Sequence, residues 1–460
     1  MAGKRKLNPG RSTNPLRADV LRVLGVLKVA TADQIQRLAL PHLTYRHTSK
    51  ETEAKRKEAR TASHRAALAD LRKHGLVLDG GSTKDNETLR GLTPMGLEAA
   101  AVELGRPMDA MGGIARGAGR TGASHPMAVN EAVLALIRPK PDLGLLDGEP
   151  ADAVAAAERE VAGPPGIGSI GSYATEVPLP STGTWSTAGK GGAQADIVLV
   201  ASEDGIPLMF IEVDNCFETA QEIAAKFDKY MRFLRRRIKD TDGREKAMWR
   251  TRWSAPSDRH GETLHPPVLL VFNQIGPRNA QNTMRQLAEL TRQHWQGHPQ
   301  RDHHTYDGKI PIVATTLDLL REHGPAGEVF WRFGRTGLQP LLAAVGNPRQ
   351  VAAEAKAEAR RNADDGAREA ERQRELAERA AARERERPSC TECGAKFTDA
   401  RWRRVNAQGW DTEAEPHPTL CDDCKDTLAN NRLHGVAEKN QTKEAAAEHK
   451  GRGLLSRLRP

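Results

Sequence analysis

Hydrophobic residues recur at helical spacing in three successive stretches between residues 16 and 71. In the first stretch, one helical face holds Leu16, Val20, Val23, Leu24 and Leu27. Thr31 and Gln34 have the spacing of a capping box, so we expect a second helix to start at Thr31. Its apolar positions, Ile35 and Leu38, would then face the interior.

The third stretch leads into a pattern typical of a β-hairpin. A third helix would be capped by Ser63 and ended by Gly75. Its inner side would carry Ala67, Leu68 and Leu71. Short runs at 76–78 and 88–92 flank a glycine-rich turn, and Thr93 is placed to cap another helix. This order of elements predicts a winged helix, in which the third helix enters the major groove and the hairpin forms the wing.

The middle of the chain alternates between strand-like and helix-like patterns. The predicted strands are 195–200, 208–213, 268–272 and 310–314. The predicted helices are 126–137, 151–161, 218–237, 279–295 and a short one from Thr316. Strands that alternate with helices favour a mixed sheet with helices packed on it, so the fold class is α/β with several domains.

From about residue 348 to 387 the chain is almost entirely Ala, Glu, Arg, Asp, Lys and Gln. Oppositely charged residues three and four positions apart favour a single solvated helix that acts as a spacer. The chain therefore divides into a basic arm (1–15), a winged-helix domain (16–105), a linker (106–124), an α/β domain (125–345), a charged helical spacer (346–388), a cysteine-containing module (389–432) and a basic disordered tail (433–460).

The charge balance of the chain favours a polyanionic partner. Lys and Arg total 69 against 60 Asp and Glu, which gives a formal net charge of +9 and a pI of about 9.3. No apolar run is long enough to span a bilayer, and the charged N-terminus lacks the apolar core of a signal peptide. Five cysteines in 460 residues are too few for a disulfide framework, so we expect a cytoplasmic protein with no membrane partner.

The basic residues cluster in and around the third helix of the predicted winged helix. That helix carries Arg65, Arg72 and Lys73, together with His64 and His74 on the face expected to point outward. The segment before it carries Lys55, Arg56, Lys57 and Arg60, and the arm carries Lys4, Arg5, Lys6 and Arg11. Such residues neutralise phosphates, which favours double-stranded DNA as the partner. The alternative is a winged helix used for protein contacts, with a solvated basic face.

Four of the five cysteines form two C-x-x-C pairs, Cys390 with Cys393 and Cys421 with Cys424. Four thiolates on two tight turns match a structural Zn²⁺ site in a zinc-ribbon-like module. A redox pair is the alternative, although no thioredoxin-like strand precedes either pair. Nearby Arg401, Trp402, Arg403 and Arg404 either contact nucleic acid or form a solvated face. The fifth cysteine, Cys216, is expected to be a reduced thiol in the core.

Three carboxylates stand at the ends of two predicted strands. Asp196 opens one strand, and Glu212 and Asp214 end the next, on one face because the strand period is two. If they converge, they would hold a hard cation such as Mg²⁺, or Mn²⁺. Lys226 and Tyr230 lie one turn apart on the following helix and are placed to face the same point. Glu131 is a further candidate ligand; the alternative is that these carboxylates are simply solvated.

The predicted winged helix, the His125-Pro126 helix, Ala195-Asp196, the strand Phe210-Ile-Glu-Val-Asp214, and Lys226 with Tyr230 resemble the replication-relaxation proteins of actinobacterial plasmids and integrated elements. The resemblance covers roughly residues 16 to 335 and implies a role in relaxing or nicking DNA during plasmid replication and transfer. The middle domain also looks like a divergent restriction-endonuclease-like core, which pairs an Asp with a Glu-x-Lys tripeptide. Asp196 and Glu212 occupy matching positions, whereas Asp214 stands where that superfamily carries lysine, and Lys226 would replace the missing cation.

Two functions remain open from the sequence. The first is a metal-dependent DNA endonuclease or nickase of a mobile element, with Asp196, Glu212, Asp214 and Lys226 in its catalytic site. The second is a non-catalytic accessory of replication or transfer, or a transcription regulator, with an inert nuclease-like core. Replication or conjugation proteins are expected partners in either case. A zinc-bearing protein scaffold would instead lack salt-sensitive DNA binding.

Overall fold

The computed structural model describes residues 9–114, 123–185, 187, 189–239, 243–254, 265–300, 303–407 and 415–432. The chain divides into two compact units, Met1–Glu354 and Ala355–Pro460. Lys4, Arg5 and Lys6 of the predicted arm, residues 115–122 of the predicted linker and the predicted tail lie outside the described residues.

The first unit begins with a helical module that carries a small sheet; we call residues 14–104 the N-terminal module. In chain order its elements are α1 (Asn14–Leu27), β1 (Val29–Thr31), α2 (Ala32–Ala39), η1 (Pro41–Tyr45), α3 (Glu53–Lys73), β2 (Val77–Ser82), β3 (Thr88–Leu92) and α4 (Pro94–Leu104). The three strands form an antiparallel sheet in the order β1-β3-β2. The order of helices and hairpin agrees with the prediction, and the Thr31–Gln34 capping box is present.

Two predictions about the third helix are wrong. α3 begins at Glu53 with Thr52 as its cap, ten residues before the predicted start at Ser63. Its first turns are rich in Ala, Glu, Lys and Arg, which favour helix without an apolar stripe, so hydrophobic spacing could not reveal them. His64 was expected on the outer face, yet it is completely buried. It lies one turn before Ala67 and Leu68 on the inner side, because helical neighbours are three or four residues apart.

A six-stranded mixed sheet forms the centre of the first unit, in the order β13-β12-β9-β6-β5-β4. Its strands are β4 (Tyr173–Leu179), β5 (Ala193–Ala201), β6 (Ile206–Asp214), β9 (Val268–Phe272), β12 (Ile312–Thr316) and β13 (Trp331–Arg332). β4, β5 and β6 form an antiparallel meander, and β6, β9 and β12 are parallel to one another. β4 was not predicted from the sequence.

Helices pack on the sheet, and the alternation of strand residues divides the core in two. The helices are α5 (Ser124–Ile137), α6 (Ala151–Ala162), α7 (Ala220–Arg235), α8 (Ala280–Leu290), α9 (Arg292–Trp295), α10 (Leu317–His323) and α11 (Leu341–Val345). Ile197 and Ile211 belong to one hydrophobic cluster, which also contains residues of α1 and α5. Val198 and Phe210 belong to another, with residues of α7 and α8. Because side chains alternate along a strand, Asp196 and Glu212 lie on the α7 side of the sheet.

Smaller elements complete the first unit. Two short hairpins pair β7 (Arg237–Lys239) with β8 (Glu245–Ala247) and β10 (His298–Gln300) with β11 (His303–Thr305). The remaining 3₁₀ turns are η2 (Met108–Ala110), η3 (Leu143–Leu145), η4 (Ile170–Ser172), η5 (Ser202–Asp204) and η6 (Met248–Thr251). They connect the larger elements and were not predicted individually.

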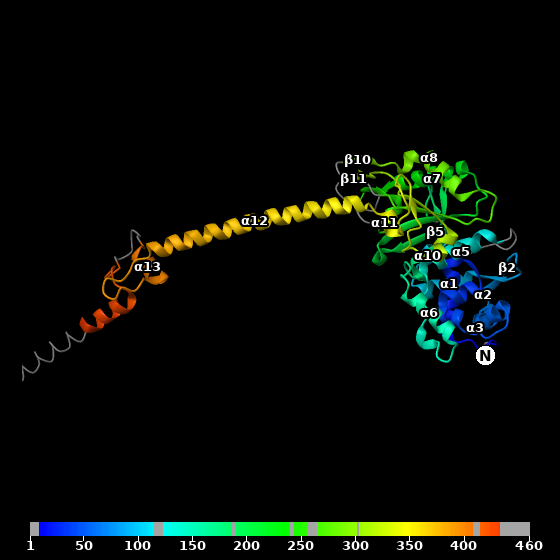
Figure 1. Ribbon diagram of the computed structural model, residues 1–460, viewed down its shortest axis with the longest axis horizontal. Coiled ribbons are helices and arrows are strands. Elements are labelled where there is room, and N and C mark those ends of the chain that lie inside the picture. Colours follow the sequence, from blue (N-terminus) through cyan, green and yellow to red (C-terminus); the bar gives the residue numbers. More distant parts are fainter. Residues whose placement is uncertain are drawn as a thin grey trace, which may run out of the picture. The chain divides into compact units, whose positions relative to one another are not determined.

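The charged helix and the cysteine module follow the core. α12 (Pro348–Glu386) runs for 39 residues across the sequence boundary between the two units (Figure 1). Nearly all of its described side chains are exposed, which agrees with the predicted solvated helix. The second unit also contains α13 (Asp399–Val405), in which the side chain of Arg401 is fully buried. Its guanidinium donates to the carbonyl oxygens of Leu420 and His417, so Arg401 holds the two cysteine pairs' loops together and is not a surface residue.

Candidate functional site

A polar cavity of about 570 Å³ opens beside the antiparallel meander and α7. Strands β4, β5 and β6 bring Glu176, Asp196 and Glu212 to it. α5 contributes His125, and α7 contributes Lys226 and Tyr230. The spacing of Lys226 and Tyr230 on one helical face therefore places both side chains where the sequence predicted, against the carboxylates.

Glu212 is the most deeply buried carboxylate of the cavity. Tyr230 donates a hydrogen bond to its Oε1 at 2.6 Å, and Lys226 Nζ lies 3.5 Å from its Oε2. Burial, followed by the charge of Asp196, raises the pKa of Glu212 to about 8. Burial opposes the charge on Lys226, but Glu212 and Glu218 outweigh it and raise the pKa of Lys226. The cavity thus holds a cationic lysine beside a glutamate whose ionisation is disfavoured.

Asp196 is oriented by groups on both sides. Its Oδ2 accepts a hydrogen bond from the backbone N–H of Val213 at 2.7 Å, which fixes the carboxylate against β6. Its Oδ1 lies 3.1 Å from Nε2 of His125, at the start of α5. The hydrogen bond to Asp196 is the main cause that raises the pKa of His125. One carboxylate oxygen of Asp196 is therefore directed at the imidazole.

Glu176 joins this pair through an unusual backbone conformation. It has a φ of 56° in the middle of β4, where the pairing with β5 skips from Thr175–Ile197 to Val177–Ala195. A non-glycine residue with left-handed φ inside a strand is strained, and such strain concentrates at functional sites. His125, Glu176 and Asp196 each offer a ligand atom, and these atoms lie within 4.8 Å of one another. The group therefore has the spacing of a metal site.

Asp214 is on the same face of β6 but serves a different structural purpose. Burial and the charge of Glu218 raise its pKa, and the backbone N–H groups of Cys216 and Glu218, in the turn after the strand, act in the opposite direction. Its Oδ2 is buried without a hydrogen-bond partner among the described residues, and Asp214 does not line the cavity. The three carboxylates picked from the sequence are therefore divided, with Asp196 and Glu212 in the cavity and Asp214 outside it at the turn.

The four paired cysteines of the second unit form the other donor cluster found among the described residues. The Sγ atoms of Cys390, Cys393, Cys421 and Cys424 lie within 4.8 Å of one another, and those of Cys393 and Cys421 are 3.7 Å apart. Four thiolates at about 2.3 Å from a tetrahedral Zn²⁺ would be roughly 3.8 Å apart. The donors and their spacing are compatible with zinc. Cys216 is buried in the first unit, as expected, and burial raises its pKa to about 11.

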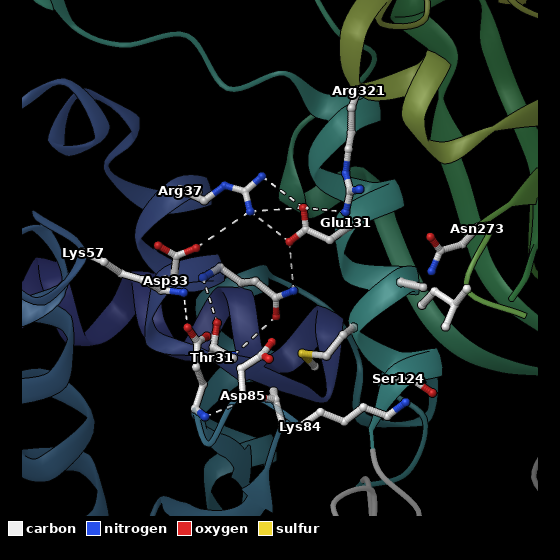
Figure 2. A pocket seen from close by; sticks show the side chains of 16 residues that line it. Thr31, Asp33, Arg37, Lys57, Lys84, Asp85, Ser124, Glu131, Asn273 and Arg321 are labelled. Atoms are coloured by element: carbon white, nitrogen blue, oxygen red, sulfur yellow. Dashed lines mark hydrogen bonds and ion pairs between the residues drawn. The ribbon is translucent and has the colours of Figure 1, made fainter. Parts of the chain in front are cut away.

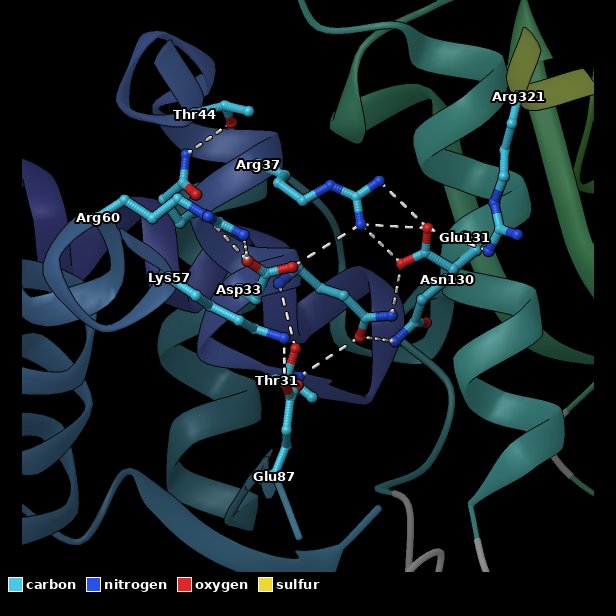
Figure 3. A network of polar contacts seen from close by, with 12 residues as sticks. Thr31, Asp33, Arg37, Thr44, Lys57, Arg60, Glu87, Asn130, Glu131 and Arg321 are labelled. Carbon is cyan, nitrogen blue, oxygen red and sulfur yellow. Dashed lines mark hydrogen bonds and ion pairs between the residues drawn. The ribbon is translucent and has the colours of Figure 1, made fainter. Parts of the chain in front are cut away.

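A second cleft, of about 480 Å³, lies at the junction between the N-terminal module and the core (Figure 2). Glu131 of α5 lies at its centre and not in the cavity with Asp196 and Glu212 (Figure 3). It forms ion pairs with Arg37 of α2 at 2.9 Å and Arg321 of α10 at 3.3 Å, and accepts a hydrogen bond from Gln34. Glu131 therefore joins α2 of the N-terminal module to α10 of the core through its two ion pairs.

The basic residues of α3 differ in their exposure and in their ion pairs. Lys55, Arg65, Arg72 and Lys73 are exposed, whereas Arg56 and Lys57 are partly buried. Arg72 pairs with Asp79 of β2 at 2.9 Å, and Lys57 pairs with Glu87. The exposed cations lie at the helix surface, where a polyanion could compete with their acidic partners.

Sequence reasoning assigned no role to His125 or Glu176. His125 immediately precedes the proline of the α5 first turn, and a histidine at a helix start facing a strand aspartate could have been noticed. Glu176 carried no such signal, because its direction depends on a left-handed φ that residue type does not encode. Among the helices of the described residues, none is both long and apolar enough to cross a membrane.

Comparison with known proteins gives one match. No similar curated protein and no similar solved structure was found. Residues 21–245 match the model of the family described as replication-relaxation. This segment, just under half of the chain, extends from α1 to β8 and contains every lining residue of the cavity named above. The match supports the replication-relaxation family for this part of the chain and leaves α12 and the cysteine module outside it.

Proposed function

We propose that the protein is a DNA-binding replication-relaxation protein that nicks or relaxes duplex DNA of a plasmid or integrated element with a divalent metal. The observation that carries the proposal is the cavity in which Asp196, Glu212 and Lys226 meet, within a segment that matches the replication-relaxation family. Such a protein would act in the cytoplasm, alongside replication or conjugation proteins.

The N-terminal module has the element order of a winged helix, and α3 would be its reading helix. One exposed stripe of α3, with spacings of three and four residues, carries Lys55, Glu58, Ala62, Arg65, Ala69 and Arg72. The alanines between the cations leave room for the helix to approach a groove closely. Phosphates would replace Asp79 and Glu58 as partners of Arg72 and Arg65, with Arg56, Lys57 and Lys73 at the edges.

The core has the order expected of a restriction-endonuclease-like domain: helix α5, the meander β4–β6, helix α7 and the parallel strand β9. Asp196 and Glu212 would hold the metal, with His125 and Glu176 as additional donors. Because Mg²⁺ prefers oxygen ligands, the imidazole donor favours Mn²⁺ over Mg²⁺. Asp214 does not line the cavity and would act indirectly, through the turn that follows β6.

When bound, the metal would activate a water molecule and offset the charge that develops on the phosphate. Glu212 must lose its proton to become a ligand, and Tyr230 and Lys226 are placed to stabilise the resulting carboxylate. Lys226 would also contact a phosphate oxygen, and so take the role of the lysine absent from position 214. Asp196 would be kept in position by the Val213 amide and His125.

The cysteine module would bind one structural Zn²⁺ through Cys390, Cys393, Cys421 and Cys424 in a zinc-ribbon-like arrangement. Replacement of Cys421 by Ser should then release the zinc and unfold the second unit alone, because metal binding there contributes the folding free energy. Loss of the thermal transition of the first unit in the same variant would contradict this assignment.

The second candidate is a non-catalytic DNA-binding accessory or regulator with an inert core. It is favoured by two observations: Asp214 replaces the superfamily's lysine, and Lys226 already pairs with Glu218 at 3.0 Å. In this case the cavity would hold its charges in place without taking up a metal.

Supercoiled plasmid distinguishes the two candidates. The wild-type protein is incubated with plasmid and Mn²⁺ or Mg²⁺, or in metal-free buffer, beside Glu212→Ala. A chelator is avoided because it would also strip zinc from the cysteines. Glu203→Ala, on the exposed turn η5, is the matched control. Nicking that needs metal and is lost only in Glu212→Ala supports the enzyme. DNA binding by all three proteins with unchanged topology supports the inert core.

A further inference from the structure

The turn between β6 and α7, residues 214–218, is held in one conformation by backbone hydrogen bonds. The carbonyl oxygen of Asp214 accepts a hydrogen bond from the backbone N–H of Asn273 at 2.7 Å, and that of Cys216 accepts one from Arg278 at 3.3 Å. Cys216 adopts a left-handed φ of 61°, while its side chain is buried in the core. A non-glycine residue is strained in that region, so the fold maintains this turn against an intrinsic preference for another conformation.

A neighbouring loop, which follows β9, braces the turn from outside. The backbone N–H of Gly276 donates to the carbonyl of Asn215 at 2.7 Å, and Asn273 donates from its side-chain amide to that of Asn215 at 2.8 Å. A Cβ atom at Gly276 would approach the carbonyl oxygen of Cys216 to 2.4 Å, so only glycine permits this close contact. The turn is therefore rigid on both sides.

This rigid turn presents a large apolar side chain to solvent. Phe217 is 58% exposed, although the residues on either side are a buried cysteine and an ion-paired glutamate. Its neighbour Glu218 pairs with Lys226 at 3.0 Å, and Lys226 lines the cavity with Glu212. Phe217 is thus one residue from a side chain that contacts the proposed catalytic lysine.

We propose that Phe217 is a wedge that stacks on, or inserts between, nucleobases beside the phosphate held in the cavity. The inference rests on the proposed DNA function. Apolar side chains inserted at a base step unstack it and bend or unwind the duplex, and aromatic faces stack on any base. A wedge must not collapse back onto its own protein, and the contacts of Asn215 and Cys216 with the loop after β9 oppose this.

Nucleobases fit the position better than a protein surface does. The apolar area is the single ring of Phe217, and charged residues border it. Glu218 lies on the same turn, and Arg278 lies on the loop after β9, where its backbone N–H donates to the carbonyl of Cys216. Protein interfaces need a broader apolar centre than one side chain supplies. A base step offers two π faces of the right size between charged phosphates.

The test measures unwinding and needs no knowledge of the DNA site. Plasmid is relaxed by a metal-independent type I topoisomerase in the presence of saturating protein, without added divalent metal, and the topoisomers are separated after protein removal. The wild-type protein should shift the distribution toward unwinding. Phe217→Ala should still bind plasmid but should shift the topoisomer distribution at most half as far as wild type. Phe217→Trp, which keeps an aromatic ring, should shift it as far as wild type.

Val102→Ala is the matched control, because Val102 on α4 is an exposed apolar residue far from the turn in sequence. It should behave as wild type. An equal shift by wild type and Phe217→Ala, or no shift by a wild-type protein that binds plasmid, would overturn the wedge and leave the proposed function intact. Failure of the wild-type protein to bind any plasmid would overturn both. A change of oligomeric state in Phe217→Ala would assign the ring to a protein contact instead.

Discussion

Two glutamates of the first unit, the partly buried Glu131 and the buried Glu212, have opposite electrostatics. Burial disfavours the charge of Glu131, but Arg37 and Arg321 outweigh it and the pKa of Glu131 is lowered. Glu212 has Asp196 as a neighbour and one lysine at 3.5 Å, so burial raises its pKa to about 8. Positive charge therefore compensates the carboxylate of Glu131, whereas the carboxylates around Glu212 have too little positive charge nearby.

This difference separates a structural ion pair from a candidate reactive site. At Glu131, two guanidinium groups and the Gln34 amide use the carboxylate oxygens, so a ligand would have to displace protein groups. In the cavity, the charge of Asp196 raises the pKa of both Glu176 and Glu212. Substituting either glutamate with its isosteric amide tests whether this contrast is real.

The largest effect is expected from Glu131→Gln. Loss of the carboxylate would leave Arg37 and Arg321 facing each other across the junction, and breaking a largely buried pair is costly. Because Arg37 is about one-third exposed, we expect the free energy of unfolding of the first unit to fall by about 2 to 3 kcal/mol. Urea denaturation measures it. Glu103→Gln, which removes an exposed partner of Arg22, should change stability by less than about 0.5 kcal/mol.

His64 sharpens the comparison as a buried group for which the nearby charge of Asp19 does not offset the effect of burial. Burial is the main cause that lowers its pKa to about 4, below its ordinary value of 6.5. Between pH 6.5 and 4 the unfolded chain binds more protons, so this histidine's contribution to stability is complete above pH 6.5 and is lost as the pH falls. We expect it to account for about 1 to 2 kcal/mol of acid destabilisation.

The measurement is urea denaturation at pH 7.5 and pH 4.5 for wild type and His64→Leu. Other groups titrate in both proteins, so the difference between their pH slopes isolates His64. Equal pH dependence of stability in the two proteins would mean that His64 can be protonated in the folded state, and that burial does not lower its pKa.

Glu212→Gln is expected to have the reverse profile from Glu131→Gln. Removing a carboxylate from a like-charged group should leave stability unchanged or increase it, since Lys226 retains Glu218 as a partner. The affinity for Mn²⁺ should fall at least tenfold, or about 1.4 kcal/mol. Titration calorimetry with Mn²⁺ measures it, with Glu203→Gln as control. Destabilisation as large as that of Glu131→Gln would place Glu212 among the structural ion pairs.

The sequence was sufficient wherever a local rule decides the structure. A continuous apolar run predicted β9, the spacing of Thr31 and Gln34 predicted the capping box, and the spacing of opposite charges predicted the charged helix. The two C-x-x-C pairs predicted that four thiols would cluster. Period-two alternation on β5 and β6, with helical spacing on α7, also brought Asp196, Glu212, Lys226 and Tyr230 together.

The sequence was insufficient wherever a tertiary contact decides the structure. Asp214 lies outside the cavity because of the turn that follows β6, and the direction of Glu176 depends on a left-handed φ. His64 is polar by composition but faces the core because of its place on α3, and Glu131 is used by arginines from α2 and α10. None of these features has a signature in neighbouring residues alone.

The smallest effect concerns charges that lie outside the core altogether. Arg72 on α3 pairs with Asp79 at 2.9 Å, but both side chains are more than half exposed, so the pair contributes little to stability. Arg72→Ala should therefore leave the unfolding free energy unchanged, weaken duplex binding severalfold, and reduce the slope of log affinity against log salt by about one. Asp79→Asn tests the opposite change. It removes the acidic partner of Arg72 but keeps the guanidinium, so it should strengthen duplex binding. If neither variant changes the salt slope, α3 does not contact phosphate, and the exposed cations of the N-terminal module are a solvated face with a different purpose from the unsatisfied charges of the cavity.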